Sequence, residues 1–334
     1  MMIKDYRYLY LLVPLILGLA FILGNYWNFP FFVIGDKAKI TLHLVTDDGK
    51  TLNNFPCSAG STVGNLLLNA ALTVNVEGRT DGNGNITFRL PSVLPEVVVG
   101  TKYGTTGYYP SGIKYSFNNT VLGKWQPWNP TEEMVVKPIL NPIPMYAKAV
   151  RLTIPSKETP VGFDLEAGDW VAPYGKGTVS DFVFTVTEKV PFVRASQPYD
   201  VTQTLSFSNK GDGIQSVLLP QNGGSALRLP RNSPEAGYQP TLPQELSLVG
   251  NKRLNGADGE VQNYFFRIRT VLDEQWNIKS ALYGKIAGPI ECGAQGYIQF
   301  TYYLNPTPND RNMEFDPSKN LFQNLPSLQQ VKAP

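Results

Sequence analysis

Most of the chain alternates apolar and polar residues with a period of two, which is typical of half-buried β-strands. In residues 38–46 (AKITLHLVT), Ile40, Leu42 and Leu44 fall on one face and polar residues on the other. Comparable stretches occur at 72–76, 86–90, 182–187, 205–207, 264–270 and 298–304. One short helix is expected at 64–71. Elsewhere beyond the N-terminal segment no helical pattern of ten or more residues occurs, and the sequence predicts an all-β fold.

The turns between these stretches are rich in glycine, asparagine and aspartate. GRTDGNGN (78–85) lies between two strand patterns and predicts a hairpin turn, since Gly and Asn adopt positive φ at low cost. We therefore expect one N-terminal transmembrane helix followed by two β-sandwich-like modules. The expected division is 1–35 cytoplasmic stub and transmembrane anchor, 36–123 first β-sandwich, 124–145 proline-rich linker and edge segment, 146–304 second β-sandwich-like domain, and 305–334 extended, surface-hugging C-terminal tail.

The N-terminal segment has a different pattern, because residues 8–23 are apolar or aromatic and carry no charge. As a helix, residues 6–27 would be about 33 Å long, enough for a hydrocarbon core of about 30 Å. Lys4 and Arg7 precede the apolar core, and a Tyr-Trp pair ends the span. This charge bias places the N-terminus in the cytoplasm. We expect a single-pass membrane protein with its bulk outside the cytoplasm, which for a bacterial chain means the inner membrane with the bulk periplasmic or extracellular.

A cleaved signal peptide is the alternative for this segment. Small residues at Gly18 and Ala20 fit a cleavage site, although apolar residues would remain behind the cut. Both interpretations predict export of the rest of the chain.

Composition narrows the classes of function. The chain has 334 residues, of which 42% are hydrophobic and 17% charged, so it can form about two packed domains. The formal net charge is +2, and no run of lysine or arginine occurs. A nucleic-acid partner would need a concentrated basic face, so we expect none.

Few residues in the sequence suit catalysis or metal binding. The only histidine, His43, lies on the polar face of a predicted strand, without a nucleophile motif nearby. One histidine and two distant cysteines do not supply a zinc site. DGNGN at 81–85 has the start of a calcium-loop spacing, but Ile86 and Ser92 stand where an EF-hand needs Gly and Glu. We expect no catalytic residue, no metal and no cofactor.

One carboxylate cluster is the best candidate for a ligand site. It comprises Asp164, Glu166 and Asp169, with Trp170 and Tyr174 beside it. The carboxylates suit calcium or acid–base chemistry on a glycoside, and the rings suit stacking on a sugar. The alternative is a surface loop in which aspartates cap backbone amides and the aromatic residues pack below. The sequence favours this structural interpretation.

Other residues could join such a site or serve as binding surfaces. Asp181 begins the next strand and could complete an ion site. Arg267 and Arg269 alternate with aromatic residues and are expected on the solvent face of a strand. Trp125 and Trp128 could stack on a sugar, or pack where the two modules join.

The two cysteines allow one disulfide in an oxidising compartment. Cys57 and Cys292 lie in turn-like contexts, and a bond between them would join an early loop to a late one. Two unpaired thiols remain the alternative, since sequence separation does not decide the question.

Several of these motifs resemble known proteins. ITLHLVTDDGKTL, GRTDGNGNITFRL and GYYPSG, within residues 38–115, resemble the carboxypeptidase-regulatory-like domain, a transthyretin-like β-sandwich. Longer motifs, including KWQPWNP, PVGFDLEAGDWVAPYGKG and NYFFRIRT, resemble uncharacterised exported proteins of planctomycete- and verrucomicrobium-like bacteria that carry such a domain. The insertion CSAGSTVGNLLLNAAL departs from the domain's pattern and leaves the second strand in doubt.

This resemblance implies an accessory domain that binds or scaffolds without catalysing. We therefore expect a non-enzymatic, membrane-anchored extracytoplasmic protein, a structural or partner-binding subunit of an envelope or membrane assembly. The alternative is a carbohydrate-binding envelope protein that uses the 164–174 loop. The expected partners are the membrane, through residues 6–27, and other proteins, with a glycan in the alternative case.

Overall fold

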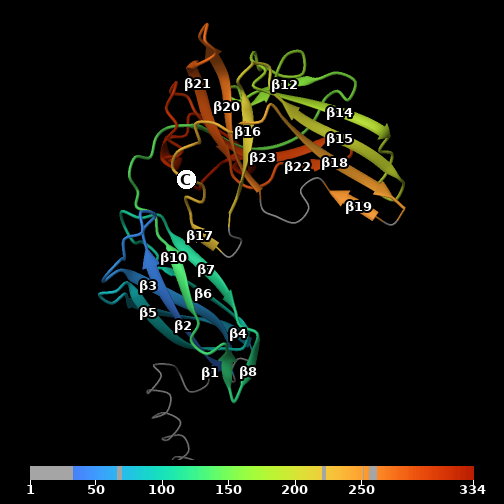
Figure 1. Ribbon diagram of the computed structural model, residues 1–334. Coiled ribbons are helices and arrows are strands. Elements are labelled where there is room, and N and C mark those ends of the chain that lie inside the picture. The colour runs from blue at the N-terminus through green and yellow to red at the C-terminus, as the bar shows by residue number, and fades with distance from the viewer. Residues whose placement is uncertain (1–32, 66–69, 220–222, 251, 256–261) are drawn as a thin grey trace, which may run out of the picture. The chain divides into compact units, whose positions relative to one another are not determined.

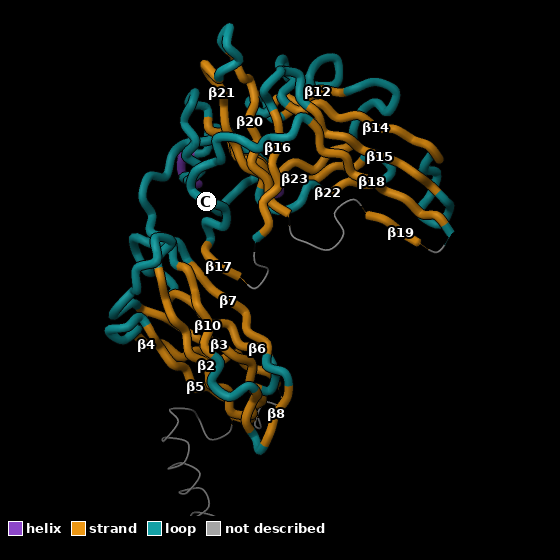
Figure 2. The backbone as a smooth tube through the Cα atoms, viewed as in Figure 1, coloured by secondary structure: helices purple, strands orange, loops and turns teal. Residues whose placement is uncertain are grey.

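The computed structural model describes residues 33–65, 70–219, 223–250, 252–255 and 262–334. These residues form β-strands, turns and two short 3₁₀ helices (Figures 1 and 2). The chain divides into two compact units, Met1–Pro138 with Asn222–Ser225, and Ile139–Gln221 with Ala226–Pro334. The prediction of an all-β fold is confirmed for the described part of the chain.

The predicted membrane span at 6–27 lies outside the described residues. None of the helices within the described ranges is long and apolar enough to cross a bilayer.

The first unit is a sandwich of two sheets. One sheet contains β1 (Val33–Ile34), β3 (Pro56–Asn65), β4 (Ala70–Arg79), β6 (Glu96–Thr101), β7 (Ser111–Ser116) and β17 (Gly223–Ser225). The other contains β2 (Asp36–Val45), β5 (Asn85–Ser92), β8 (Asn119–Val121), β9 (Lys124–Gln126) and β10 (Thr131–Val135). Inward residues of both sheets form one apolar core, so each sheet is hydrophobic on one face.

Strands β2 and β5 confirm the predicted alternation. They pair antiparallel from Asp36 opposite Ser92 to His43 opposite Asn85. Ile40, Leu42 and Leu44 are fully buried, and the inward residues of β5 are buried opposite them. A shift of one residue would expose the whole apolar set, so burial fixes this register.

Two local expectations in the first unit are wrong. The turn at 81–84 does not close a hairpin, since β4 pairs with β3 and β5 pairs with β2. The turn instead carries the chain from one sheet of the sandwich to the other. The expected helix at 64–71 is also wrong where the structure describes it, because β3 extends to Asn65 and β4 begins at Ala70.

The first unit extends further along the chain than the predicted boundary at 123. β9 and β10 lie within the expected linker 124–145, yet both pair with β2 in parallel. Met134 and Val136 are buried in the core of this unit. The segment therefore belongs to the first sandwich, whose main part runs to Pro138 and which β17 joins from later in the chain.

The second unit is also a sandwich. One sheet contains β11 (Tyr146–Thr153), β16 (Gly213–Leu218), β20 (Gln262–Leu272), β21 (Ile278–Ile286), β22 (Glu291–Gly293) and β23 (Tyr297–Asn305). The other contains β12 (Val161–Asp164), β13 (Asp169–Trp170), β14 (Phe182–Val190), β15 (Tyr199–Ser206), β18 (Thr241–Val249) and β19 (Lys252–Asn255). Figure 1 shows β14, β15 and β18 side by side, as their registers require.

Aromatic side chains fill the space between these sheets. Phe182 meets Phe266 edge to face at 5.1 Å between ring centroids, and Phe163 meets Phe300 at 6.0 Å. Edge-to-face pairs of this kind add about 0.5–1.5 kcal/mol each beyond the area that they bury.

The C-terminal segment, expected as a surface-hugging tail, is part of the second unit. It includes η1 (Pro317–Lys319) and η2 (Ser327–Gln329), and Phe315 is fully buried. Asn320 accepts a hydrogen bond from the N–H of Ala147 (3.2 Å) and donates one to its carbonyl (2.7 Å). The segment thus satisfies backbone groups along β11, an edge strand that would otherwise be open.

Candidate functional site

The loop between β12 and β14 contains the predicted carboxylate cluster, and Asp164 organises it. Asp164 Oδ1 accepts hydrogen bonds from the N–H groups of Glu166 and Ala167, both at 3.0 Å. Its Oδ2 accepts from the N–H groups of Thr178 (2.9 Å) and Val179 (3.1 Å). One buried carboxylate therefore joins the two ends of the loop.

Asp169 performs the same role inside the loop. Its carboxylate accepts hydrogen bonds from the backbone N–H groups of Trp170 (2.9 Å) and Lys176 (3.2 Å). The turn packs tightly, since a Cβ on Gly177 would lie 2.7 Å from Cβ of Asp164. The glycine at that position permits this close approach.

Arg269 from β20 holds the cluster together across the sandwich. It binds Asp181 with two hydrogen bonds, Nε to Oδ1 at 2.8 Å and Nη2 to Oδ2 at 3.0 Å. Its Nη1 lies 2.9 Å from Glu166 Oε2, and its Nη2 lies 3.4 Å from Asp164 Oδ1. Bidentate pairing of this type is the strongest arginine–carboxylate geometry.

A backbone irregularity positions Arg269. Its φ is +53°, and the pairing of β20 with β21 shifts register between Ile268 and Val271. Asp212 stabilises this bulge by accepting hydrogen bonds from the N–H groups of Arg269 (3.1 Å) and Thr270 (2.8 Å). The expectation that Arg269 faces solvent is wrong, because the bulge turns its side chain onto the carboxylates.

The electrostatics follow from burial and these contacts. Burial acts to raise the pKa of Asp164, but hydrogen bonds from Thr178, Ala167 and Val179 outweigh it and lower the pKa below its usual value of 3.8. For Asp181 burial prevails and raises the pKa, although the hydrogen bonds of Arg269 oppose it.

This arrangement leaves little for catalysis or ion binding. The guanidinium of Arg269 lies where a cation between the carboxylates would have to sit. Across the described residues, no group of three or more His, Cys, Asp or Glu side chains is placed to hold a metal ion. The geometry supports the structural interpretation of the cluster.

The two aromatic residues of the predicted site are placed differently from each other. Trp170 is 5% exposed and packs edge to face on Phe163 (5.3 Å) and Phe184 (5.7 Å). Trp170 therefore fits the favoured structural interpretation, and the alternative of stacking on a sugar does not apply to it. Tyr174, at 46% exposed, does lie on the surface of the loop.

Beside this loop lies a small pocket of ≈ 210 Å³. Its lining includes the cationic side chains of Lys148, Arg151 and Lys176, together with Asp169. Lys148 donates a hydrogen bond to the carbonyl of Gly168 (2.6 Å), and burial lowers its pKa. The volume is below the roughly 300–1,000 Å³ of typical small-molecule sites, so the pocket suits at most a small anionic group.

The other singled-out side chains serve mainly structural contacts. His43 Nδ1 lies 3.0 Å from Asn85 Oδ1 across the β2–β5 pair. Arg267 donates to the carbonyl of Gly211 and covers the ring of Tyr238 at 4.8 Å, so it is not a free surface cation. Trp125 donates to the carbonyl of Ser92 (3.0 Å).

The two cysteines are free thiols. Cys57 is fully buried in the core of the first unit, and Cys292 packs against that of the second. Of the two alternatives that the sequence left open, the structure has the unpaired thiols, since each side chain packs in a separate core. Burial raises the pKa of both thiols to about 12, which keeps them protonated at neutral pH.

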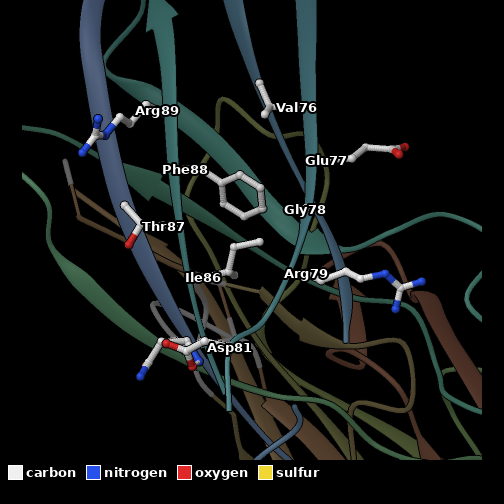
Figure 3. Close-up of a pocket in the computed structure, with 10 residues that line it drawn as sticks. Val76, Glu77, Gly78, Arg79, Asp81, Ile86, Thr87, Phe88 and Arg89 are labelled. Atoms are coloured by element: carbon white, nitrogen blue, oxygen red, sulfur yellow. Dashed lines mark hydrogen bonds between the residues drawn. The ribbon is translucent and has the colours of Figure 1, made fainter. Parts of the chain in front are cut away.

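A groove along the open side of the first sandwich is the second candidate site. It has a volume of ≈ 400 Å³ and runs between β4 and β5, the outer strands of the two sheets. Figure 3 shows Ile86 and Phe88 reaching from β5 toward β4, with Arg79 and Arg89 extending on opposite sides. The groove thus has an apolar floor and charged rims, which carry Glu77 and Asp81 as well as the two arginines.

The groove exists because of how β4 is built. Gly78 has no side chain, and a Cβ there would lie 2.7 Å from the end of Ile86. No described strand pairs with the outer side of β4, so its ten-residue edge is open. The sequence predicted these strands but not this groove, because it assigned them to one hairpin.

Acid should destabilise the loop between β12 and β14, because protonation of Asp164 weakens the hydrogen bonds that this carboxylate accepts. Because its folded pKa is lowered, its contribution to stability is complete well above pH 3.8 and is lost as the pH falls through the folded pKa. Asp164→Asn should cost about 1–3 kcal/mol at pH 7. Hydrogen exchange of second-unit peptides in both proteins should show this difference shrinking toward pH 2–3. A difference that stays constant would contradict this assignment.

Comparisons with known proteins add little. No family model and no curated protein matches this chain. A crystal structure of a DUF3823 family protein from Parabacteroides merdae is 9% identical and is aligned over 84% of this chain and 100% of its own length. The TM-score of 0.21 is too low for this likeness to carry an argument.

Proposed function

We propose that this protein is a non-enzymatic, membrane-anchored extracytoplasmic binding subunit, and that its partner adds a strand to the outer side of β4. The anchor is the span expected at residues 6–27. The observation that carries the proposal is the open edge of β4, ten residues long, beside an apolar groove. Strand addition gives affinity through backbone hydrogen bonds, and alternate side chains of the guest give specificity.

The contrast with other edges supports this choice. β5 carries Pro91 near its end, which limits pairing on that side, and the C-terminal segment covers β11. β4 has no proline, and its charged residues, Glu77 and Arg79, lie together near its C-terminal end. Natural proteins usually protect long edge strands, so an unprotected one marks an interaction site.

The groove indicates the chemistry of the guest strand. Val76, Ile86 and Phe88 would receive apolar side chains from alternate positions of an extended segment. The rims carry both signs of charge, Arg79 and Arg89 with Glu77 and Asp81, and so favour polar or charged residues at the positions between them. The resemblance of this unit to an accessory domain agrees with a binding role, and so does the internal use of the carboxylate cluster.

The test compares assembly size in detergent extracts of the protein's own membranes. The wild-type chain should migrate in a complex larger than its own 37.0 kDa. Thr73→Lys combined with Asn75→Lys places charges on the exposed face of β4 and should release the chain as a monomer. Val98→Lys is the matched control, because Val98 is exposed but its strand β6 is paired on both sides, and it should leave the complex intact. A monomeric wild type, or an assembly unchanged by the double variant, would refute the proposal.

A further inference from the structure

One end of the first sandwich exposes apolar side chains beside the point where the described chain begins. β8 and β9 form a hairpin in which Val121 pairs with Lys124, so Leu122 and Gly123 make the two-residue turn. Leu122 is 96% exposed and Val121 is 51% exposed. These two residues form what we call the hairpin tip.

Leucine is a poor choice for this turn on two grounds. Leu122 has φ +49° and Gly123 has φ +67°, the conformation of a type I′ turn, in which Asn-Gly is the favoured pair. A non-glycine residue with positive φ is strained, and leucine lacks the short polar side chain that relieves the strain in asparagine. The position therefore combines an unfavourable backbone with an almost fully exposed apolar side chain, which neither folding nor solubility explains.

The tip lies next to the N-terminal strands of the unit. The N–H of Lys37 donates to the carbonyl of Gly123 (2.9 Å), and β9 pairs with β2 at this residue. β1 begins at Val33 and pairs with the end of β3. Figure 1 places β1 and β8 at the same end of the first unit.

A second apolar turn belongs to the same end. Val93 and Leu94 follow β5 and are 41% and 46% exposed. The residue before them, Ser92, pairs with Asp36 and accepts a hydrogen bond from Trp125 of β9. Two turns from different parts of the chain thus present exposed apolar side chains around the start of β2.

The length of chain that precedes this end determines what it can face. Five residues separate Trp27, the end of the expected span, from Val33, so these two ends can lie at most about 20 Å apart. Two lysines, Lys37 and Lys124, and the acidic Asp36 lie beside the tip, and Glu96 is paired with Lys114 (2.6 Å). Charged side chains at the edge of an apolar tip suit the polar headgroup region of a membrane.

We propose that this end of the first sandwich sits in the membrane interface, with Val121 and Leu122 inserted among the lipids and Val93 and Leu94 at the surface. This inference rests on the membrane anchor of the proposed function. Contact at the tip would fix the orientation of the first unit relative to the bilayer. The open edge of β4 would then face sideways, along the membrane surface.

The experiment uses the full-length chain reconstituted into phosphatidylethanolamine–phosphatidylglycerol vesicles. Val121→Cys is labelled with an environment-sensitive dye, and brominated lipids are added as quenchers. The native thiols, with pKa raised to about 12, should react little at pH 7, and the labelled wild type measures that background. Tyr103→Cys is the matched control, because Tyr103 is 99% exposed and follows β6 at the opposite end of the unit.

Quenching at position 121 but not at position 103 is the expected result. Leu122→Asn then provides the decisive comparison, because asparagine suits the type I′ turn and leaves folding intact. This change should abolish most of the quenching at 121 without lowering the stability of the first unit.

The possible failures can be told apart. A chain that does not float with the vesicles refutes the membrane anchor and with it the proposed function. A chain that floats but shows no quenching at 121 refutes only the insertion of the tip. A dye at 121 that is shielded from water but insensitive to brominated lipid would show that a protein covers the tip, which also overturns the inference.

Discussion

Replacing Arg269 with methionine should destabilise the second unit by about 3–5 kcal/mol, the usual cost of removing one partner from a buried ion pair. The change leaves the Asp181 carboxylate, whose side chain is fully buried, with the Leu165 amide as its remaining described hydrogen-bond donor. Glu166 and Asp164 lose the same cation. Hydrogen exchange of second-unit peptides in the full-length protein measures the loss without interference from the first unit.

Two further variants distinguish this effect from simple loss of a side chain. Arg194→Met removes an exposed arginine and should change stability by less than about 0.5 kcal/mol. Adding Asp181→Asn to Arg269→Met should restore part of the stability, since the unpaired buried charge is then absent. If the double variant were as unstable as Arg269→Met alone, the charge of Asp181 would not be the cause.

Glu314→Ala should have an effect of similar size, about 3–5 kcal/mol, although Glu314 belongs to the C-terminal segment. Its side chain is 2% exposed and lies 3.0 Å from Arg231, and its carboxylate accepts hydrogen bonds from the amides of Leu140 and Asn141, both at 2.9 Å. Truncation removes the acceptor of these two amides and the buried carboxylate that faces Arg231. Exchange should accelerate in the C-terminal segment and also along β11, which this segment covers.

Glu235→Ala is the matched control for this prediction. Glu235 also pairs with an arginine, Arg311, at 2.8 Å, but its side chain is 79% exposed. Exposed pairs contribute about 0–1 kcal/mol, so this variant should remain close to the wild type. An equally small effect of Glu314→Ala would mean that the C-terminal segment is peripheral to the fold after all.

The candidate site shows which parts of the structure local sequence can predict. The capping role of Asp164 and Asp169 was one of the alternatives that the sequence allowed, because an aspartate in a glycine-rich turn finds backbone amides close by. The sequence did not predict the cation that pairs with the carboxylate cluster. Arg269 lies 105 positions from Asp164 in the sequence and was expected on a solvent face, because strict alternation does not anticipate a bulge.

Local sequence also failed to predict the groove beside β4 and the position of Trp170. The turn at 81–84 has the composition of a hairpin, and the same local geometry also joins strands of two different sheets. Trp170 lies in a turn-like stretch of the sequence, after Gly168 and Asp169, but β13 places it against Phe163 and Phe184. In both cases the outcome depends on which distant strands pack together.

The sequence by itself determined the all-β class, most strand positions and the inward faces of strands such as β2, because alternation along one strand specifies its own buried side. Only the tertiary structure decided which sheet each strand joins, that Arg269 neutralises the carboxylate cluster, and that β4 keeps an open edge. Those features depend on burial and charge pairing between residues far apart in the chain, where the free energy of a contact is set by the partners that the fold brings to it.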